Sequence, residues 1–131
     1  MAALYQNVDC IELYVPDLEE GIHYYRDCLG LKLLWRTETS VGFGMESDIA
    51  EILIQNERKH MSIDIKVESV CDAVDRIIQA GGRVKVGPFD IPIGKCAVIC
   101  DKWENEHVIL DMTKGKYTTD EEGYVTGVSK S

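Results

Sequence analysis

The chain has 131 residues, of which 45% are hydrophobic and 28% are charged, so it has the usual size of one domain with one buried core. Its net charge of -9 would repel phosphate groups, which argues against a nucleic-acid partner. No run approaches the roughly 20 apolar residues of a membrane span. The N-terminal segment also lacks the basic and apolar regions of a signal peptide. We therefore expect a cytoplasmic protein with no membrane partner.

The five cysteines are Cys10, Cys28, Cys71, Cys96 and Cys100, and no two of them form a CxxC pair. An odd number of cysteines, mostly within apolar or amphipathic segments, favours buried free thiols in a reducing compartment over a disulfide framework. The spacing also argues against a tetrathiolate zinc site.

The segment 10–30, CIELYVPDLEEGIHYYRDCLG, predicts a strand followed by a capped helix. Apolar residues alternate along the strand, and Pro16 discourages an earlier helical turn. Asp17 has the residue type of an N-cap, and Glu20 completes the sequence form of a capping box. Apolar residues then recur at helical spacing until Gly30, which can adopt the left-handed conformation that ends a helix.

The segment 62–82, SIDIKVESVCDAVDRIIQAGG, repeats this pattern at a constant offset, so that Ile11 aligns with Ile63 and Gly30 with Gly82. Three strand-like runs follow each copy, at 31–37, 40–46 and 50–56 and then at 83–89, 94–101 and 107–112. A constant offset held through a strand, a helix and its final glycine indicates a duplication. The sequence therefore predicts an α+β fold of two tandem βαβββ modules.

We place one domain at residues 1–113, with the modules at about 7–56 and 58–112. Residues 114–131 lose the periodicity and gain Gly, Ser and Thr. We expect them to form a C-terminal tail that is mobile or docks on the surface.

Three motifs, CIELYVPDLEEGIHYYRDCLGL, the AGG that ends the second helix and the turn DKWEN before HVILDM, resemble the vicinal oxygen chelate superfamily. This superfamily includes glyoxalases, bleomycin resistance proteins and extradiol dioxygenases, and the resemblance covers roughly residues 7–112. It implies curved mixed sheets around a ligand cavity, helices on the convex faces, and a homodimer with shared cavities. In the metalloenzymes, two histidines and two carboxylates hold a divalent metal that acts as a Lewis acid.

At the positions of the family's metal ligands, this chain has Cys10, Ser62 and Val108 where the resemblance implies two histidines and a glutamate. The remaining carboxylate corresponds to Glu51. We therefore expect no metal cofactor. A rearranged site of Cys10, Glu51 and His60 is the alternative, although oxygen-preferring ions disfavour a thiolate ligand.

Cys10 could also act as a nucleophile, which needs a base and a positive surrounding to form the thiolate. Its nearest neighbour on the same strand face is Glu12, which favours a small buried thiol instead. We interpret His23 and His107 as structural or solvated residues, and His60 as a residue of the polar turn NERKH.

The inward-facing positions combine acidic with large apolar side chains, as expected for a pocket that binds an organic molecule with a positive charge. The candidate ligand-binding residues are Cys10, Glu12, Trp35, Phe43, Met45, Glu51, Ser62, Asp64, Trp103, Val108 and Leu110. The alternative assigns Trp35, Phe43 and Met45 to the core or to a dimer interface.

The sequence thus predicts a metal-free protein that binds a small hydrophobic or cationic molecule, for sequestration, resistance or sensing, as in bleomycin resistance proteins. The alternative is a glyoxalase-like, metal-dependent lyase or isomerase with a rearranged metal site. A third interpretation is a ligand-sensing module of a larger regulator, because one fold can carry many functions.

Overall fold

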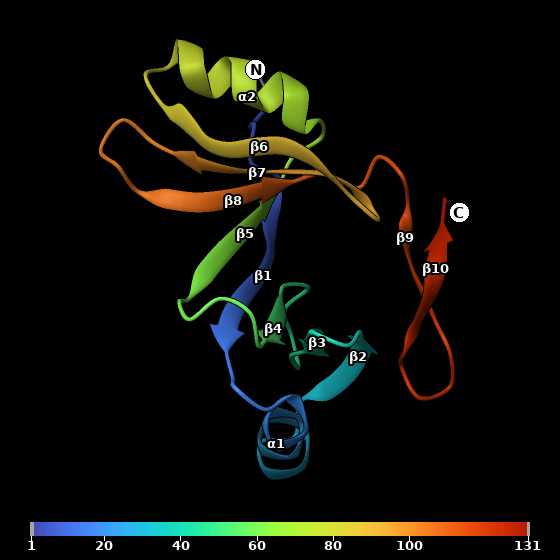
Figure 1. Ribbon diagram of the computed structural model, residues 1–131. Helices are drawn as coiled ribbons and strands as arrows, with labels where there is room; N and C mark the ends of the chain where they lie inside the picture. Colours follow the sequence, from blue (N-terminus) through green and yellow to red (C-terminus); the bar gives the residue numbers. More distant parts are fainter. Residues whose placement is uncertain (1, 131) are drawn as a thin grey trace. The chain divides into compact units, whose positions relative to one another are not determined.

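A computed structural model describes residues 2–130 of the chain (Figure 1). The chain divides into two compact units, each of which contains most of one predicted module. The first unit consists of residues 9–63 and 117–127, and the second of residues 2–8, 64–116 and 128–130.

The first module contains one helical segment and four strands. Its elements are β1 (Asn7–Tyr14), α1 (Leu18–Ile22), the π-helix η1 (His23–Cys28) that continues α1, β2 (Lys32–Arg36), β3 (Ser40–Gly44) and β4 (Glu51–Gln55). The strands lie in the order β2-β3-β4-β1. β1 is parallel to β4, and the other neighbours are antiparallel.

The second module repeats this arrangement. Its elements are β5 (Ser62–Lys66), α2 (Val70–Gln79), β6 (Arg83–Ile91), β7 (Gly94–Cys100) and β8 (Glu106–Leu110). The strands lie in the order β5-β8-β7-β6, and again only the first and last strands of the module are parallel. The equal order and pairing of the elements confirm the predicted α+β fold of tandem βαβββ modules.

Asp17 caps the first helical segment as predicted, and capping residues of the same types are present in both modules. The Asp17 carboxylate accepts hydrogen bonds from the backbone N–H groups of Glu19 and Glu20 at 2.9 and 3.2 Å, and Ser69 caps α2 in the same way. Gly30 and Gly81 have φ angles of 79° and 103°, a region that favours glycine. No helix among residues 2–130 is long and apolar enough to cross a membrane.

Each helix packs on one face of the sheet of its own unit, as Figure 1 shows for α2 over β6 and β7. The first core cluster consists of Leu18, Ile22, Val41, Phe43 and Ile54, and the second of Val67, Val70, Ala73, Val74, Ile77, Ala97, Ile99 and Ile109. Each large side chain buried in this way contributes about 1.5–3 kcal/mol. Because side chains alternate along a strand, the opposite face carries the other residues of each strand.

The C-terminal segment forms two strands that the sequence analysis did not predict, β9 (Lys116–Thr119) and β10 (Val125–Ser129), which pair as a hairpin. In the first unit, the connecting turn docks on β2. The backbone N–H of Arg36 donates to the carbonyl of Gly123 at 2.8 Å, and the Arg36 guanidinium lies 4.7 Å from the Tyr124 ring centroid. These two strands lack the apolar alternation by which a strand is recognised in a sequence. Their position depends on the contacts with β2 instead.

Candidate functional site

Several predicted site residues of the first unit lie on the sheet face opposite α1. Cys10 of β1 lies directly across from Glu51 of β4, and Glu12 lies across from Leu53. Cys10 and Glu12 are only 2% and 6% exposed. The parallel pairing of β1 with β4 therefore places a thiol and two carboxyl groups on one face.

A β-bulge in β2 brings Trp35 to the same face. Leu33 pairs with Phe43, but Trp35 pairs with Gly42, so β2 contains one extra residue between these pairs. The Trp35 indole N–H donates to Glu51 Oε1 at 2.7 Å. The indole fits because position 42 is glycine: a Cβ there would overlap Trp35 Nε1 and lie 2.7 Å from Glu51 Oε1.

The surroundings of Glu51 favour its neutral form. Burial raises the pKa of Glu51, the indole hydrogen bond opposes this effect, and the charge of Asp9 adds to the rise. Tyr117 of the hairpin lies beside this pair, with its ring centroid 5.2 Å from that of Trp35. Burial raises the pKa of Tyr117 as well, and the carboxylates of Asp9 and Glu51 raise it further. The rings of Trp35 and Tyr117 thus lie near the carboxyl groups of Asp9 and Glu51 in the first unit.

The second carboxyl on this face, that of Glu12, has a basic partner. Arg58 Nη2 donates to Glu12 Oε1 at 2.6 Å. The buried amide of Gln55 holds the turn that carries Arg58: it donates to the Arg58 carbonyl at 2.6 Å and accepts from the backbone N–H groups of Glu57 and Arg58. The ion pair balances the charge of Glu12, which makes this residue a poor partner for a cationic ligand.

Sequence reasoning missed Asp9, Arg58 and Tyr117 as parts of this arrangement. Arg58 belongs to the turn NERKH, whose polarity predicted only a loop. Tyr117 belongs to the segment that was expected to be a tail. The strand-favouring residues Tyr117, Thr118 and Thr119 in KYTT were the available signal, but the run is too short to identify a strand.

Phe43 lies in the core, which is the alternative that the sequence left open for it. This side chain is fully buried on the helix side of β3, in the core cluster with Ile22 and Ile54, and its ring centroid lies 5.8 Å from that of Tyr25. The alternation in β3 places Gly42 on the open face and Phe43 on the other. Met45, which follows β3, and Ser62, which begins β5, are both half-buried.

In the second unit, Asp64 of β5 lies across from Val108 of β8. Asp64 and Leu110 are buried, and Val108 is half-buried. Trp103 is 74% exposed in the turn after β7, where Lys102 Nζ lies 5.1 Å from its ring centroid. The structure therefore places Asp64 and Val108 together but leaves Trp103 on the surface of this unit.

The residues at the family's metal-ligand positions do not fit a divalent metal. Val108 has no donor atom in its side chain, and the carboxyl of Glu51 is hydrogen-bonded to an indole and has a raised pKa. Within residues 2–130, no group of three or more His, Cys, Asp or Glu side chains is arranged to hold a metal ion. His60 of the alternative set is exposed in the turn before β5.

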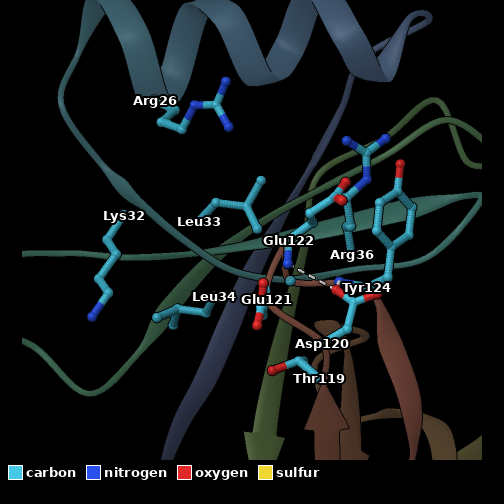
Figure 2. A pocket seen from close by; sticks show the side chains of 11 residues that line it. Arg26, Lys32, Leu33, Leu34, Arg36, Thr119, Asp120, Glu121, Glu122 and Tyr124 are labelled. Atoms are coloured by element: carbon cyan, nitrogen blue, oxygen red, sulfur yellow. Dashed lines mark hydrogen bonds between the residues drawn. The ribbon is translucent and has the colours of Figure 1, made fainter.

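A concave surface lies between β2 and the turn of the hairpin, with a volume of about 720 Å³. Figure 2 shows Arg26 on the helix above the strands and Arg36 beside Tyr124. The basic residues that line this groove are Arg26, Lys32 and Arg36, and the acidic residues are Asp120, Glu121 and Glu122. Because the two charges balance, the groove favours neither a cation nor an anion.

Comparisons with known proteins agree with this fold. A family model of the Glyoxalase/Bleomycin resistance protein/Dioxygenase superfamily matches residues 7–124. A search of curated proteins finds no match.

Several solved structures resemble the chain. Methylmalonyl-CoA epimerase from Mycobacterium tuberculosis is 15% identical, with a TM-score of 0.70 over 85% of this chain and 92% of that chain. The Mn(II)-bound glyoxalase from Novosphingobium aromaticivorans is 16% identical, with a TM-score of 0.61 over 80% of this chain and 37% of that chain. Homoprotocatechuate 2,3-dioxygenase from Brevibacterium fuscum is 16% identical, with a TM-score of 0.60 over 83% and 37%. Identities this low carry the fold but not the activity.

Proposed function

The chain belongs to the Glyoxalase/Bleomycin resistance protein/Dioxygenase superfamily, and on this premise we propose that it binds a small organic molecule without using a metal ion. The observation that carries the proposal is the pairing of Trp35 with Glu51. A carboxyl group at a family metal-ligand position here accepts an indole hydrogen bond at 2.7 Å, and burial raises its pKa. Such a group suits hydrogen bonding to an organic ligand better than metal coordination.

The groups around Glu51 support a hydrophobic ligand that carries a positive charge. Asp9 and Glu51 raise the pKa of Tyr117, so their negative potential reaches the aromatic pair. The rings of Trp35 and Tyr117 can each contribute about 0.5–2 kcal/mol to a cation placed over them. The proposed role is sequestration of such a compound, as in bleomycin resistance proteins, or its sensing.

This ligand class has a defined pH dependence. A bound cation favours the ionised form of Glu51, whose pKa is raised in the free protein. Affinity for a cation should therefore increase as the pH rises through this raised pKa. A ligand that accepts a hydrogen bond from the neutral carboxyl should show the opposite dependence.

The binding test uses Trp35 as the reporter. Trp103→Phe removes the other tryptophan, and the variant is titrated with benzyltrimethylammonium while Trp35 fluorescence is recorded. We expect a saturable change, and an affinity about tenfold lower after Glu51→Gln, since an ion pair with the ligand is lost. Glu38→Gln removes an exposed carboxylate of the same unit and should leave the affinity unchanged. An equal loss in both variants contradicts a role for Glu51.

The metal-free part of the proposal needs a separate measurement. The protein is incubated with Ni²⁺, Zn²⁺, Mn²⁺ or Fe²⁺, excess metal is removed, and the remaining metal is measured by elemental analysis. We expect substoichiometric metal in every case. A stoichiometric ion would contradict the proposal and favour the alternative of a glyoxalase-like lyase or isomerase.

We propose in addition that the protein is a cytoplasmic homodimer. The family resemblance supports the dimer, and so do Val86 and Phe89 on β6, which are apolar but 48% and 40% exposed. Sedimentation velocity at micromolar concentration should give the mass of two chains, and Phe89→Lys should shift the equilibrium toward the monomer. A monomer at all concentrations contradicts this proposal but not the binding role.

A further inference from the structure

The π-helix η1 brings a thiol, an imidazole and a carboxylate together on the surface of the first unit. Cys28 Sγ lies 3.7 Å from His23 Nε2, and His23 Nδ1 lies 3.3 Å from Asp27 Oδ2. This is the order of a nucleophile, its base and the group that orients the base. None of these side chains is needed for the core, because no residue of η1 is buried.

The juxtaposition depends on the π-helical backbone. In an α-helix with 3.6 residues per turn, the neighbours of residue 23 on its own face are residues 26 and 27, so Cys28 would point away from His23. The wider turn of a π-helix, with bonds between residues five apart, places positions 27 and 28 on either side of position 23. The backbone N–H of Leu29 donates to the carbonyl of Tyr24 at 3.0 Å, a hydrogen bond between residues five apart.

Arg26 fixes the state of the carboxylate. Its Nε donates to Asp27 Oδ1 at 2.9 Å, and this hydrogen bond is the main cause of the lowered pKa of Asp27. The charged carboxylate favours a proton on His23 Nδ1, and Nε2 can then accept the proton of the Cys28 thiol. The geometry is that of an activated thiol at an accessible position.

We propose that Cys28 is a thiol-exchange site that reacts with small disulfides, with His23 as its base and Asp27 as the residue that orients His23. His23 Nε2 takes the thiol proton, and the Cys28 sulfur attacks one sulfur of the disulfide. The disulfide bond of the small molecule breaks and a mixed disulfide with Cys28 forms. The other half leaves as a thiolate and receives the proton from His23, so no further oxidant or reductant is consumed.

The chain contains a matched control for this chemistry. Cys71 is also exposed and also lies on a helix, α2. For residues 2–130, the structure records no hydrogen bond between Cys71 and a histidine. Cys71 also lies in the first turn of α2 and interacts electrostatically with Lys95, two features that promote thiol reactivity, so a faster reaction at Cys28 requires the proposed base.

The experiment follows mixed-disulfide formation on the reduced full chain with glutathione disulfide as the probe at pH 7. Samples are quenched with acid at intervals, and the adduct on each cysteine is quantified by peptide mass spectrometry. We expect Cys28 to react about tenfold faster than Cys71, which is below the roughly 10²–10⁴-fold typical of general base catalysis because the site is exposed to water.

His23→Gln keeps a polar side chain but removes the base. It should reduce the rate at Cys28 to that of Cys71 and leave the rate at Cys71 unchanged, and circular dichroism checks that α1 and η1 persist. Equal rates at Cys28 and Cys71 in the unsubstituted protein would overturn the proposal. An unchanged rate at Cys28 in His23→Gln, with the helices intact, would overturn it as well.

Discussion

Glu51 in the first unit is half-buried and Asp111 in the second unit is buried, and the pKa values of the two carboxyl groups shift in opposite directions. Asp111, which follows β8, is 2% exposed. Its carboxylate accepts from the backbone N–H groups of Val70 and Lys95 at 2.8 and 2.9 Å and from the Thr113 hydroxyl at 2.9 Å. Burial would raise the pKa of Asp111, but these hydrogen bonds outweigh burial and lower it.

For Glu51, the hydrogen bond from the Trp35 indole does not offset burial, and the pKa is raised. The opposite pKa shifts indicate that Asp111 is a structural carboxylate, whereas Glu51 can still respond to a ligand. The Asp111 carboxylate links the start of α2 to β7, because it accepts hydrogen bonds from backbone N–H groups of both elements. Glu51 gains if a ligand supplies a positive charge or another donor, which is the physical reason to place the candidate site in the first unit.

The largest expected effect is that of Asp111→Ala, which leaves the buried N–H groups of Val70 and Lys95 without their acceptor. We expect the free energy of unfolding at pH 7 to fall by about 3 kcal/mol, measured by urea denaturation. Asp90→Ala removes an exposed aspartate that pairs with Lys95 and Lys114, and it should change the melting temperature little.

The pH dependence of the stability of Asp111→Ala tests whether the pKa of Asp111 is lowered. The pKa of Asp111 is lowered from 3.8, so its stabilisation is complete above that value and is lost as the pH falls through the folded-state pKa. The difference in stability between the unsubstituted protein and Asp111→Ala should therefore shrink in strong acid. A difference that stays constant down to the folded-state pKa and below contradicts a charged Asp111.

Gly94→Ala should have the next largest effect. A Cβ at position 94 would overlap Asp111 Oδ1 and the Asp111 carbonyl oxygen, and the backbone cannot move away without disturbing the strand ends. We expect a loss of about 2 kcal/mol in urea denaturation. Gly127→Ala is the control, because its Cβ would lie 3.5 Å from Thr118 Oγ1, and its effect should stay within about 0.5 kcal/mol.

Gly42→Ala should cost less than Gly94→Ala, since the Cβ meets side chains that can move, namely the Trp35 indole and the Glu51 carboxyl. We expect a loss of about 1 kcal/mol from the broken hydrogen bond. The Trp35 fluorescence should shift in the Trp103→Phe background. An unchanged emission spectrum would mean that the indole does not lie over Gly42.

The smallest effect is expected for Glu51→Gln, which keeps an acceptor for the indole but cannot ionise. The raised pKa of Glu51 stabilises the folded protein below the ordinary value of 4.5, and this contribution is lost as the pH rises through the folded-state pKa. The variant should lack that loss and be more stable at pH 7 by less than about 1 kcal/mol. A destabilised variant whose stability has the same pH dependence as the unsubstituted protein contradicts a raised pKa of Glu51.

The sequence predicted the local parts of the site but not their partners. Strand alternation is a local property, so it placed Cys10 and Glu12 on one face before any tertiary contact was known, whereas Glu51 was assigned to the site through the family resemblance. Phe43 could not be assigned to the pocket or to the core because glycines on both sides of it hide the alternation of β3. The partner of Glu12, Arg58, could not be predicted from its polar turn, since a hydrogen bond 46 positions apart depends on where that turn folds.

The sequence by itself determined the duplicated βαβββ order, the helix ends and the two faces of each sheet, because capping, periodicity and repetition act between residues close in the chain. Only the tertiary structure decided the bulge that turns Trp35 toward Glu51, the hairpin that brings Tyr117 beside it, and the π-helix that places Cys28 next to His23. The first two depend on contacts between segments distant in sequence. The third depends on backbone hydrogen bonds between residues five apart, which the spacing of apolar residues did not indicate.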